Sequence, residues 1–139
     1  MNYTEQNKAV VIRFNKECIE QGNPASFKEL LSDNAINHTA PPGMPNGPES
    51  FTHFLNNILR VGFPDVKVEI ADQIAEGDKV VSRKILRGTH TGEFMGIAAT
   101  HKKVVIHVID IIRIENGKYA EHWAMSNLTD VIKMLSANE

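Results

Sequence analysis

The spacing of the apolar residues changes once along this chain, and the change limits the folds open to it. Up to residue 62 the apolar residues recur at intervals near those of a helix, and from residue 66 they alternate with polar ones, as in half-buried strands. Helices therefore come first and strands second. This order is typical of an α+β domain in which helices pack on one face of a curved antiparallel sheet.

The first half predicts three helices. Residues 4–21 form an amphipathic helix that ends at Gly22, and Asn23 is expected to cap a second, short helix. A segment rich in proline and glycine, residues 37–48, follows as a loop of the kind that often edges a binding site. A third helix is expected over residues 48–60.

The second half predicts strands joined by turns, a connector and a last short helix. Alternating residues, turn-forming Glu-Gly-Asp and Asn-Gly sequences and long apolar runs support this interpretation. In chain order we expect a strand near 66–70, a turn at 76–78, a strand over 79–91, a connector over 92–102, a strand over 103–114, a hairpin, and a helix with Asn127 as its N-cap.

Length and charge bound the class of protein. The chain has 139 residues, so we expect a single domain over residues 1–139. Its net charge is −2 with no run of Lys or Arg, which argues against nucleic-acid or membrane partners. No apolar run reaches the roughly 20 residues that span a bilayer, so we expect a soluble, cytoplasmic and unprocessed protein. The single Cys18 is expected to be a buried, inert thiol.

The C-terminal hairpin carries the residues that predict a site. Asp110, Glu121, His122 and Trp123 lie among Val, Ile and Met. A buried charge without a partner is costly, so such a group indicates a polar pocket.

The partner of Asp110 across this hairpin depends on the turn. A two-residue turn at Asn116 and Gly117 places Asp110 opposite Trp123. A three-residue loop with a bulge places it opposite His122 and leaves Trp123 on the other face. We favour the second register, because it brings an acid beside an imidazole.

Several short motifs follow one another in a characteristic order along the chain. They are Asn37-His38, Pro41-Pro42-Gly43, Gly47-Pro48, Arg87-Gly88-Thr89-His90-Thr91-Gly92, Ile109-Asp110-Ile111, Arg113, Gly117-Lys118 and Glu121-His122-Trp123. In this order and spacing they resemble the SnoaL-like polyketide cyclases, and the match covers nearly the whole sequence.

The resemblance implies a fold like that of nuclear transport factor 2. This is a cone of helices against a strongly bent antiparallel sheet, which encloses one apolar pocket and commonly forms a dimer through the sheet. It further implies cofactor-free intramolecular aldol chemistry on a polyketide-like compound, in which an acid beside a histidine moves protons.

Two positions depart from the pattern that the resemblance implies. Aligned through Gly117 and Lys118, the cyclases carry their essential aspartate at the position of Ala124 and the supporting histidine at Asp110. Alanine transfers no proton, so the family's arrangement is absent. A substitute pair of Asp110 and His122 would give a general base with a pKa near neutrality. The alternatives are that Asp110 only ties down the sheet or that His122 faces solvent.

Four other residues complete the candidate site. His38 is a candidate for proton transfer at the pocket mouth, and its alternative is a hydrogen bond within the loop. Phe14, His90 and Trp123 are candidates for substrate binding, although Phe14 and Trp123 also suit ordinary packing and His90 a strand-end surface position. No sequence motif for a metal or a phosphate is present.

These observations lead to two functional hypotheses. The first is a cofactor-independent cyclase, isomerase or hydrolase that acts on a polyketide-like or other apolar carbonyl compound. The second is a noncatalytic small-molecule-binding or dimerisation module. The polarity of the pocket distinguishes them, because an enzyme needs convergent ionisable groups in a void.

Overall fold

A computed structural model describes residues 3–137. Its sheet has five strands in the order β1-β5-β4-β3-β2, and all neighbours are antiparallel except the parallel pair β1 and β5. The elements in chain order are α1 (Tyr3–Arg13), η1 (Phe14–Glu20), α2 (Pro24–Leu30), β1 (Leu31–Asn37), α3 (Pro48–Phe54), η2 (Leu55–Leu59), α4 (Arg60–Gly62), β2 (Lys67–Glu76), β3 (Lys79–Thr89), β4 (Lys103–Glu115), β5 (Lys118–Ser126) and α5 (Leu128–Ser136).

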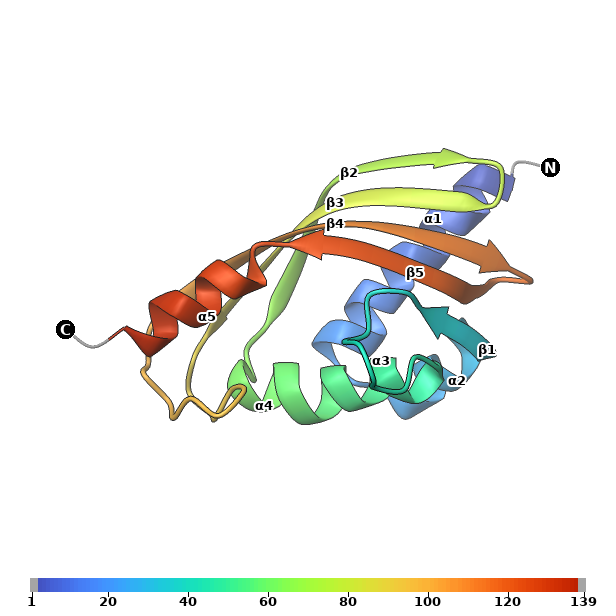
Figure 1. Ribbon diagram of the computed structural model, residues 1–139. Coiled ribbons are helices and arrows are strands. Elements are labelled where there is room, and N and C mark those ends of the chain that lie inside the picture. Colours follow the sequence, from blue (N-terminus) through green and yellow to red (C-terminus); the bar gives the residue numbers. More distant parts are fainter. Residues whose placement is uncertain (1–2, 138–139) are drawn as a thin grey trace.

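The strands bend together into one curved layer, and the N-terminal helices lie on its concave side (Figure 1). Helix α1 runs along the sheet, α3 and α4 cross below it, and α5 extends from the end of β5. The α+β architecture predicted from the change in periodicity is therefore confirmed.

The predicted helices are present, with two π-helical segments inside them. Helix α1 continues directly into the π-helix η1, and α3 continues into η2. Asn23 is the predicted N-cap of α2, and its side chain accepts hydrogen bonds from the amides of Ala25 and Ser26. Gly22 has the left-handed φ of 64° expected at the end of the first helix.

Two local expectations were wrong. Strand β1 lies where the sequence gave no strand signal, because its pairing with β5 comes from a segment far along the chain. Asn127 is the N-cap of α5, as predicted, but the capping bond expected from its side chain is absent. Its Oδ1 accepts instead from the amide of His107 on β4, so it ties the last helix to the sheet.

The expected hairpin register is also wrong. The turn is the two-residue one, since Glu115 pairs with Lys118, and Asn116 and Gly117 have the positive φ values of 53° and 75° that a type I′ turn needs. A bulge at Ala120 then shifts the register, so that Asp110 pairs with Ala124 rather than with His122 or Trp123.

The same bulge decides which side chains point inward. In a regular strand Tyr119 and His122 would point to opposite faces, because they are three residues apart. With one extra residue between them, Tyr119 pairs with Ile114 and His122 with Ile112, and both partners are buried on the concave face. Trp123 pairs with Ile111 on the convex face, as the favoured register also expected.

The core fills the space between the concave face and the helices. Phe14, Phe63, Phe94 and Ile112 are almost fully buried there, as is the predicted buried thiol of Cys18. Burial raises the pKa of Cys18 to about 12, which agrees with an inert thiol.

Candidate functional site

Polar side chains interrupt the concave face of the three central strands. Ser82 and Lys84 on β3 and Asp110 on β4 are each at most 6% exposed, and Ser82 pairs directly with Asp110. Tyr119 and His122 on β5 face the same interior. Because buried polar groups are costly, their gathering on one face marks the candidate site.

A buried ion pair lies at the centre of this group. Lys84 Nζ lies 2.9 Å from Asp110 Oδ2 and donates a hydrogen bond of 2.8 Å to Asn15 Oδ1. Asn15 sits in the π-helix η1 and donates its own amide to the carbonyl of Val11. Sequence reasoning missed Lys84, although its alternation with the apolar residues Val80 and Leu86 places it on the inward face.

His122 is held by a residue from the sheet edge. Its Nδ1 lies 2.9 Å from Asn37 Oδ1, and the same oxygen accepts a 3.0 Å hydrogen bond from the amide of Thr39. An amide N–H only donates, so the atom that faces Thr39 is the oxygen of Asn37 and His122 Nδ1 carries a proton. In the neutral ring Nε2 is then unprotonated.

Burial also sets the charge of His122. Desolvation lowers its pKa to about 4, although the nearby Asp110 favours the charged form and opposes part of this shift. The ring meets Phe51 edge-on at 5.4 Å between centroids. The imidazole of His122 is therefore neutral at pH 7, and it points to the concave face, where it is partly buried.

Asp110 and His122 share the concave face without the direct contact that the sequence suggested. Asp110 pairs with Lys84, whereas His122 hydrogen-bonds to Asn37. Asn37, and not Asp110 as expected, orients the imidazole of His122.

His38 and Trp123 lie on the other side of the sheet edge. Their rings stack at 4.6 Å with an interplanar angle of 7°, and His38 Nε2 lies 2.9 Å from Glu121 Oε1. Glu121 also accepts a hydrogen bond from Arg113, and Arg113 and His38 together lower its pKa. These residues form a cluster of their own, on the face opposite to Asp110 and His122.

His90 and Phe14 are both interior residues. His90 is fully buried rather than on the surface, because the 90–102 loop folds over it and Thr100 donates its amide to His90 Nδ1. Phe14 stacks on Tyr119 at 3.9 Å between centroids. Phe14 therefore fixes the ring of Tyr119 at the candidate site.

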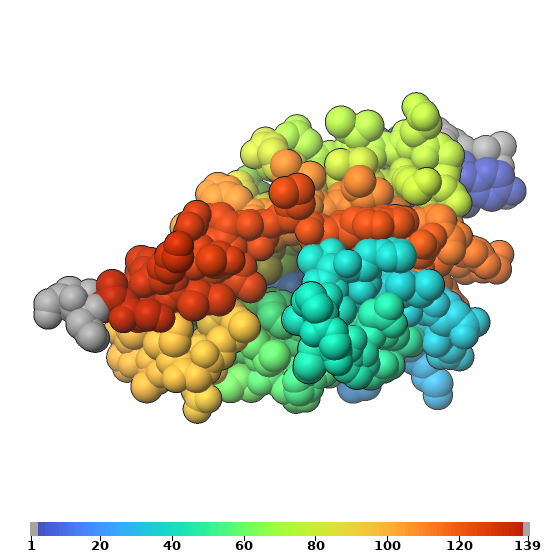
Figure 2. Space-filling view, viewed as in Figure 1, coloured from blue at the N-terminus to red at the C-terminus, as the bar shows by residue number. Residues whose placement is uncertain are grey.

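The surface is hollowed beside this site. Figure 2 shows a hollow between β5 and α5, the 90–102 loop, α3 and α4, and the loop after β1, with blue atoms of the N-terminal helices visible at its floor. Two of these elements carry partly buried residues. They are Phe54 on α3, and His122 and Ala124 on β5. The hollow therefore lies beside a strand of the candidate site.

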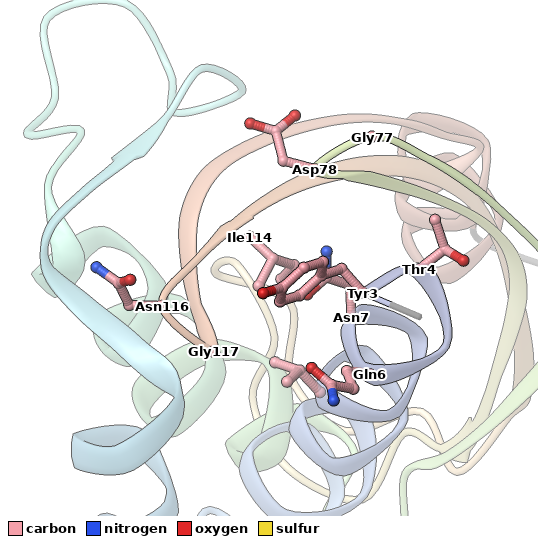
Figure 3. A pocket seen from close by; sticks show the side chains of 10 residues that line it. Tyr3, Thr4, Gln6, Asn7, Gly77, Asp78, Ile114, Asn116 and Gly117 are labelled. Carbon is pink, nitrogen blue, oxygen red and sulfur yellow. The ribbon is translucent and has the colours of Figure 1, made fainter. Parts of the chain in front are cut away.

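A separate surface pocket of about 800 Å³ lies at the other end of the sheet. It is bounded by the start of α1 with Tyr3 and Asn7 and by the two hairpin turns with Asp78 and Asn116 (Figure 3). It holds none of the predicted site residues. We therefore place the candidate site on the concave face of the sheet, where the buried polar groups are.

Two structural features are absent from residues 3–137, the part of the chain that the structure describes. None of the helices there is both long and apolar enough to cross a membrane. In the same residues no three His, Cys, Asp or Glu side chains gather in an arrangement that could hold a metal ion.

The curved sheet, the helices on its concave face and the short C-terminal helix define a protein of the nuclear transport factor 2-like fold. Residues 9–135 match the family model of the SnoaL-like polyketide cyclases, so the chain belongs to that family. No curated protein matches it.

Solved structures agree with this assignment. A protein from Jannaschia Sp. CCS1 named as a SnoaL-like polyketide cyclase is 25% identical with a TM-score of 0.85, over 98% of this chain and 95% of that one. IdmH from Streptomyces antibioticus, named as a polyketide cyclase, is 26% identical with a TM-score of 0.78, over 95% and 99%. TsrD from Streptomyces laurentii, 24% identical with a TM-score of 0.83 over 96% and 97%, shares the fold.

Proposed function

We propose that this protein is a cofactor-independent enzyme of the cyclase, isomerase or hydrolase type that acts on a polyketide-like or other apolar carbonyl compound. His122 is its general base. The observation that carries the proposal is the hydrogen bond from His122 Nδ1 to Asn37 Oδ1, which leaves Nε2 unprotonated on a residue of the concave face. Family membership supports the class of substrate.

The proposed reaction begins with proton abstraction. His122 Nε2 takes a proton from the carbon next to the carbonyl group, and the electron pair of that C–H bond moves to form an enol or enolate. The imidazolium then returns the proton to carbon or to the product oxygen. A base whose pKa is near 4 is weak, but it stays unprotonated over the whole neutral range.

The remaining predicted residues take different parts in this proposal. Asp110 with Lys84 supplies a buried polar floor next to Ala124, the residue that stands where the resemblance places the cyclase aspartate. His38 and Trp123 lie on the opposite face and take no part in proton transfer. Aromatic polyketide cyclisation by that aspartate is therefore not the reaction we propose.

Deuterium exchange into 2-tetralone tests the proposal. This small apolar ketone exchanges its α-protons in D2O when a base removes them, and NMR follows the loss of the proton signal. The wild type should accelerate exchange, and His122→Gln should lose about 100-fold or more of the acceleration. His53→Gln, a change at an exposed histidine on α3, serves as the matched control and should leave exchange unchanged.

A noncatalytic binding module is the second candidate function. The loss of an acidic side chain at Ala124 favours it. Under this alternative 2-tetralone binds and raises the melting temperature, yet exchange stays at the rate in buffer. Binding without exchange would therefore replace the enzymatic proposal.

We further propose that the protein is a homodimer through the convex face of its sheet. Ile109 is 53% exposed and Met125 82%, and the two residues pair directly across β4 and β5. Val105 and the half-buried Ile111 and Trp123 extend the same apolar surface. A partner copy would cover side chains that are otherwise costly to expose together.

A further inference from the structure

Three buried oxygen atoms on adjacent strands make no hydrogen bond. They are Ser82 Oγ on β3, Asp110 Oδ1 on β4 and Tyr119 Oη on β5. All three residues are at most 2% exposed. An unpaired buried polar atom is unfavourable, and such atoms are rare in folded proteins. Three such oxygen atoms on one face of the sheet indicate that a hydrogen-bonding group of a ligand binds between them.

Ser82 and Tyr119 both lie near Asp110. Ser82 pairs with Asp110 across β3 and β4. The phenol of Tyr119 is close enough for the charge of Asp110 to raise its pKa, a smaller effect than that of burial. The ring of Tyr119 cannot swing away, since it is stacked on Phe14.

The hydrogen-bonding capacity of each oxygen atom determines which ligand group could bind between them. The other oxygen of Asp110 is already paired with Lys84, so Oδ1 is a carboxylate oxygen that only accepts. Tyr119 is a protonated phenol that can donate, and Ser82 can do either. A single neutral O–H group satisfies this set by donating to Asp110 and accepting from Tyr119 or Ser82. A ketone or ether has no proton to donate, and an anion would be repelled.

The residues next to Asp110 on the concave face have small, partly exposed side chains, past which a ligand could reach the three oxygen atoms. Ala124 lies directly opposite Asp110, and Val108 stands two residues from it on the same face of β4. Both are half-buried, and Ala124 belongs to β5, which borders the hollow in Figure 2. The side chain of Ala124 is a single methyl group, so the residue opposite Asp110 offers it no polar partner.

We infer that Ser82, Asp110 and Tyr119 form a hydroxyl-binding subsite that selects alcohols, phenols or enols among the apolar compounds entering the hollow. This inference rests on the proposed function, because it assigns the polar end of the same ligand. The hydroxyl group lies at the floor of the site, and the apolar body of the ligand extends towards His122.

A pair of isosteric probes tests the subsite. 2-Naphthol carries a hydroxyl group where 2-methylnaphthalene carries a methyl group of similar size. Titration calorimetry, or thermal shifts at equal concentrations, gives their relative affinities. The wild type should bind 2-naphthol about tenfold or more tightly than 2-methylnaphthalene. Tyr119→Phe and Ser82→Ala should reduce that preference, and His122→Gln should keep it.

Tyr3→Phe is the matched control, because it removes the same hydroxyl group from the chain's other tyrosine, which is 64% exposed. It should leave the preference unchanged. Without ligand, Tyr119→Phe should keep the wild-type melting temperature, since it removes a hydroxyl group that has no partner.

Three results would overturn the inference. One is equal binding of the two probes by the wild type, and another is an undiminished preference for 2-naphthol in Tyr119→Phe. The third is a lower melting temperature of unliganded Tyr119→Phe together with an ordered water among the three oxygens that 2-naphthol does not displace. Equal binding with His122-dependent exchange intact removes only the subsite, whereas binding of neither probe removes the proposed function as well.

Discussion

Asn37 and His122 share a hydrogen bond whose direction is fixed by a third group. The amide of Thr39 donates to the same oxygen of Asn37, at 3.0 Å, that lies 2.9 Å from His122 Nδ1. The side-chain amide therefore cannot turn its nitrogen towards the imidazole without losing the Thr39 contact. One short loop after β1 thus sets the tautomer of a side chain on β5.

Replacing Asn37 distinguishes its effect on the tautomer of His122 from its effect on the pKa of His122. Asn37→Leu removes the acceptor, so His122 should lose its fixed tautomer and 2-tetralone exchange should fall by about 10- to 100-fold. Asn37→Asp keeps an acceptor and adds a charge that raises the pKa of His122, so exchange should persist but be lost at a higher pH than in the wild type. Identical pH profiles for all three proteins would contradict the positioning role.

Stability should depend on pH through His122. Its pKa is about 4 in the folded protein and near 6.5 in the unfolded chain, so the unfolded state binds the extra proton as the pH falls below 6.5. The lowered pKa of His122 therefore contributes to the free energy of unfolding in full above pH 6.5, and this contribution is lost as the pH falls from 6.5 to 4. Between pH 7.5 and pH 5 the loss amounts to about 2 kcal/mol.

Urea unfolding at the two pH values measures this effect. The loss of stability should be smaller in His122→Gln than in the control His53→Gln, which changes an exposed side chain. Equal losses in the two variants would show that His122 titrates normally in the folded state.

The buried pair of Lys84 and Asp110 should be costly to break from one side. Lys84→Met or Asp110→Asn leaves a buried group without its partner, and each should lower the free energy of unfolding by about 3–5 kcal/mol. The double change Lys84→Met with Asp110→Leu should recover much of that loss. Urea unfolding gives the three values, and single changes that cost less than about 1 kcal/mol would show that the pair is solvated.

Asp110→Asn also distinguishes a structural from a catalytic role for this carboxylate. If the residue only ties the sheet together, stability should fall while 2-tetralone still binds. If it serves the reaction, exchange should fall further than the lost stability accounts for, when measured at a temperature where the variant is folded.

The convex face should carry the dimer contact. Ile109→Lys places a charge on a residue that is 53% exposed in the single chain and covered in the proposed dimer. The variant should be a monomer by light scattering at concentrations where the wild type is a dimer. Lys28→Glu, at an exposed position of α2 on the other side of the sheet, is the control for a change of charge. A wild type that is monomeric at all concentrations contradicts the proposal.

The fold was predictable because its signals are local. The helical spacing of the first half, the cap at Asn23 and the alternation along β3 each depend on neighbouring residues. Strand β1 was not predictable, because it pairs with residues nearly 90 positions away, as Leu31 does with Tyr119. His90 similarly owes its burial to a loop whose path the sequence does not specify.

The site was predictable only in part, and a single residue explains most of the difference between the predicted and the observed contacts. The bulge at Ala120 turns both Tyr119 and His122 inward, and no property of an alanine within an apolar strand reveals it. The sequence located Asp110 and His122 on the hairpin but could not give their partners. Those partners, Lys84 and Asn37, come from β3 and β1.

The proposed mechanism depends on the protonation state of His122, which long-range ¹H–¹⁵N NMR between pH 5.5 and pH 8 observes directly. The ring should stay neutral throughout, with the proton on Nδ1 and Nε2 unprotonated. A ring that titrates near pH 6.5, or one that carries its proton on Nε2, would contradict this mechanism.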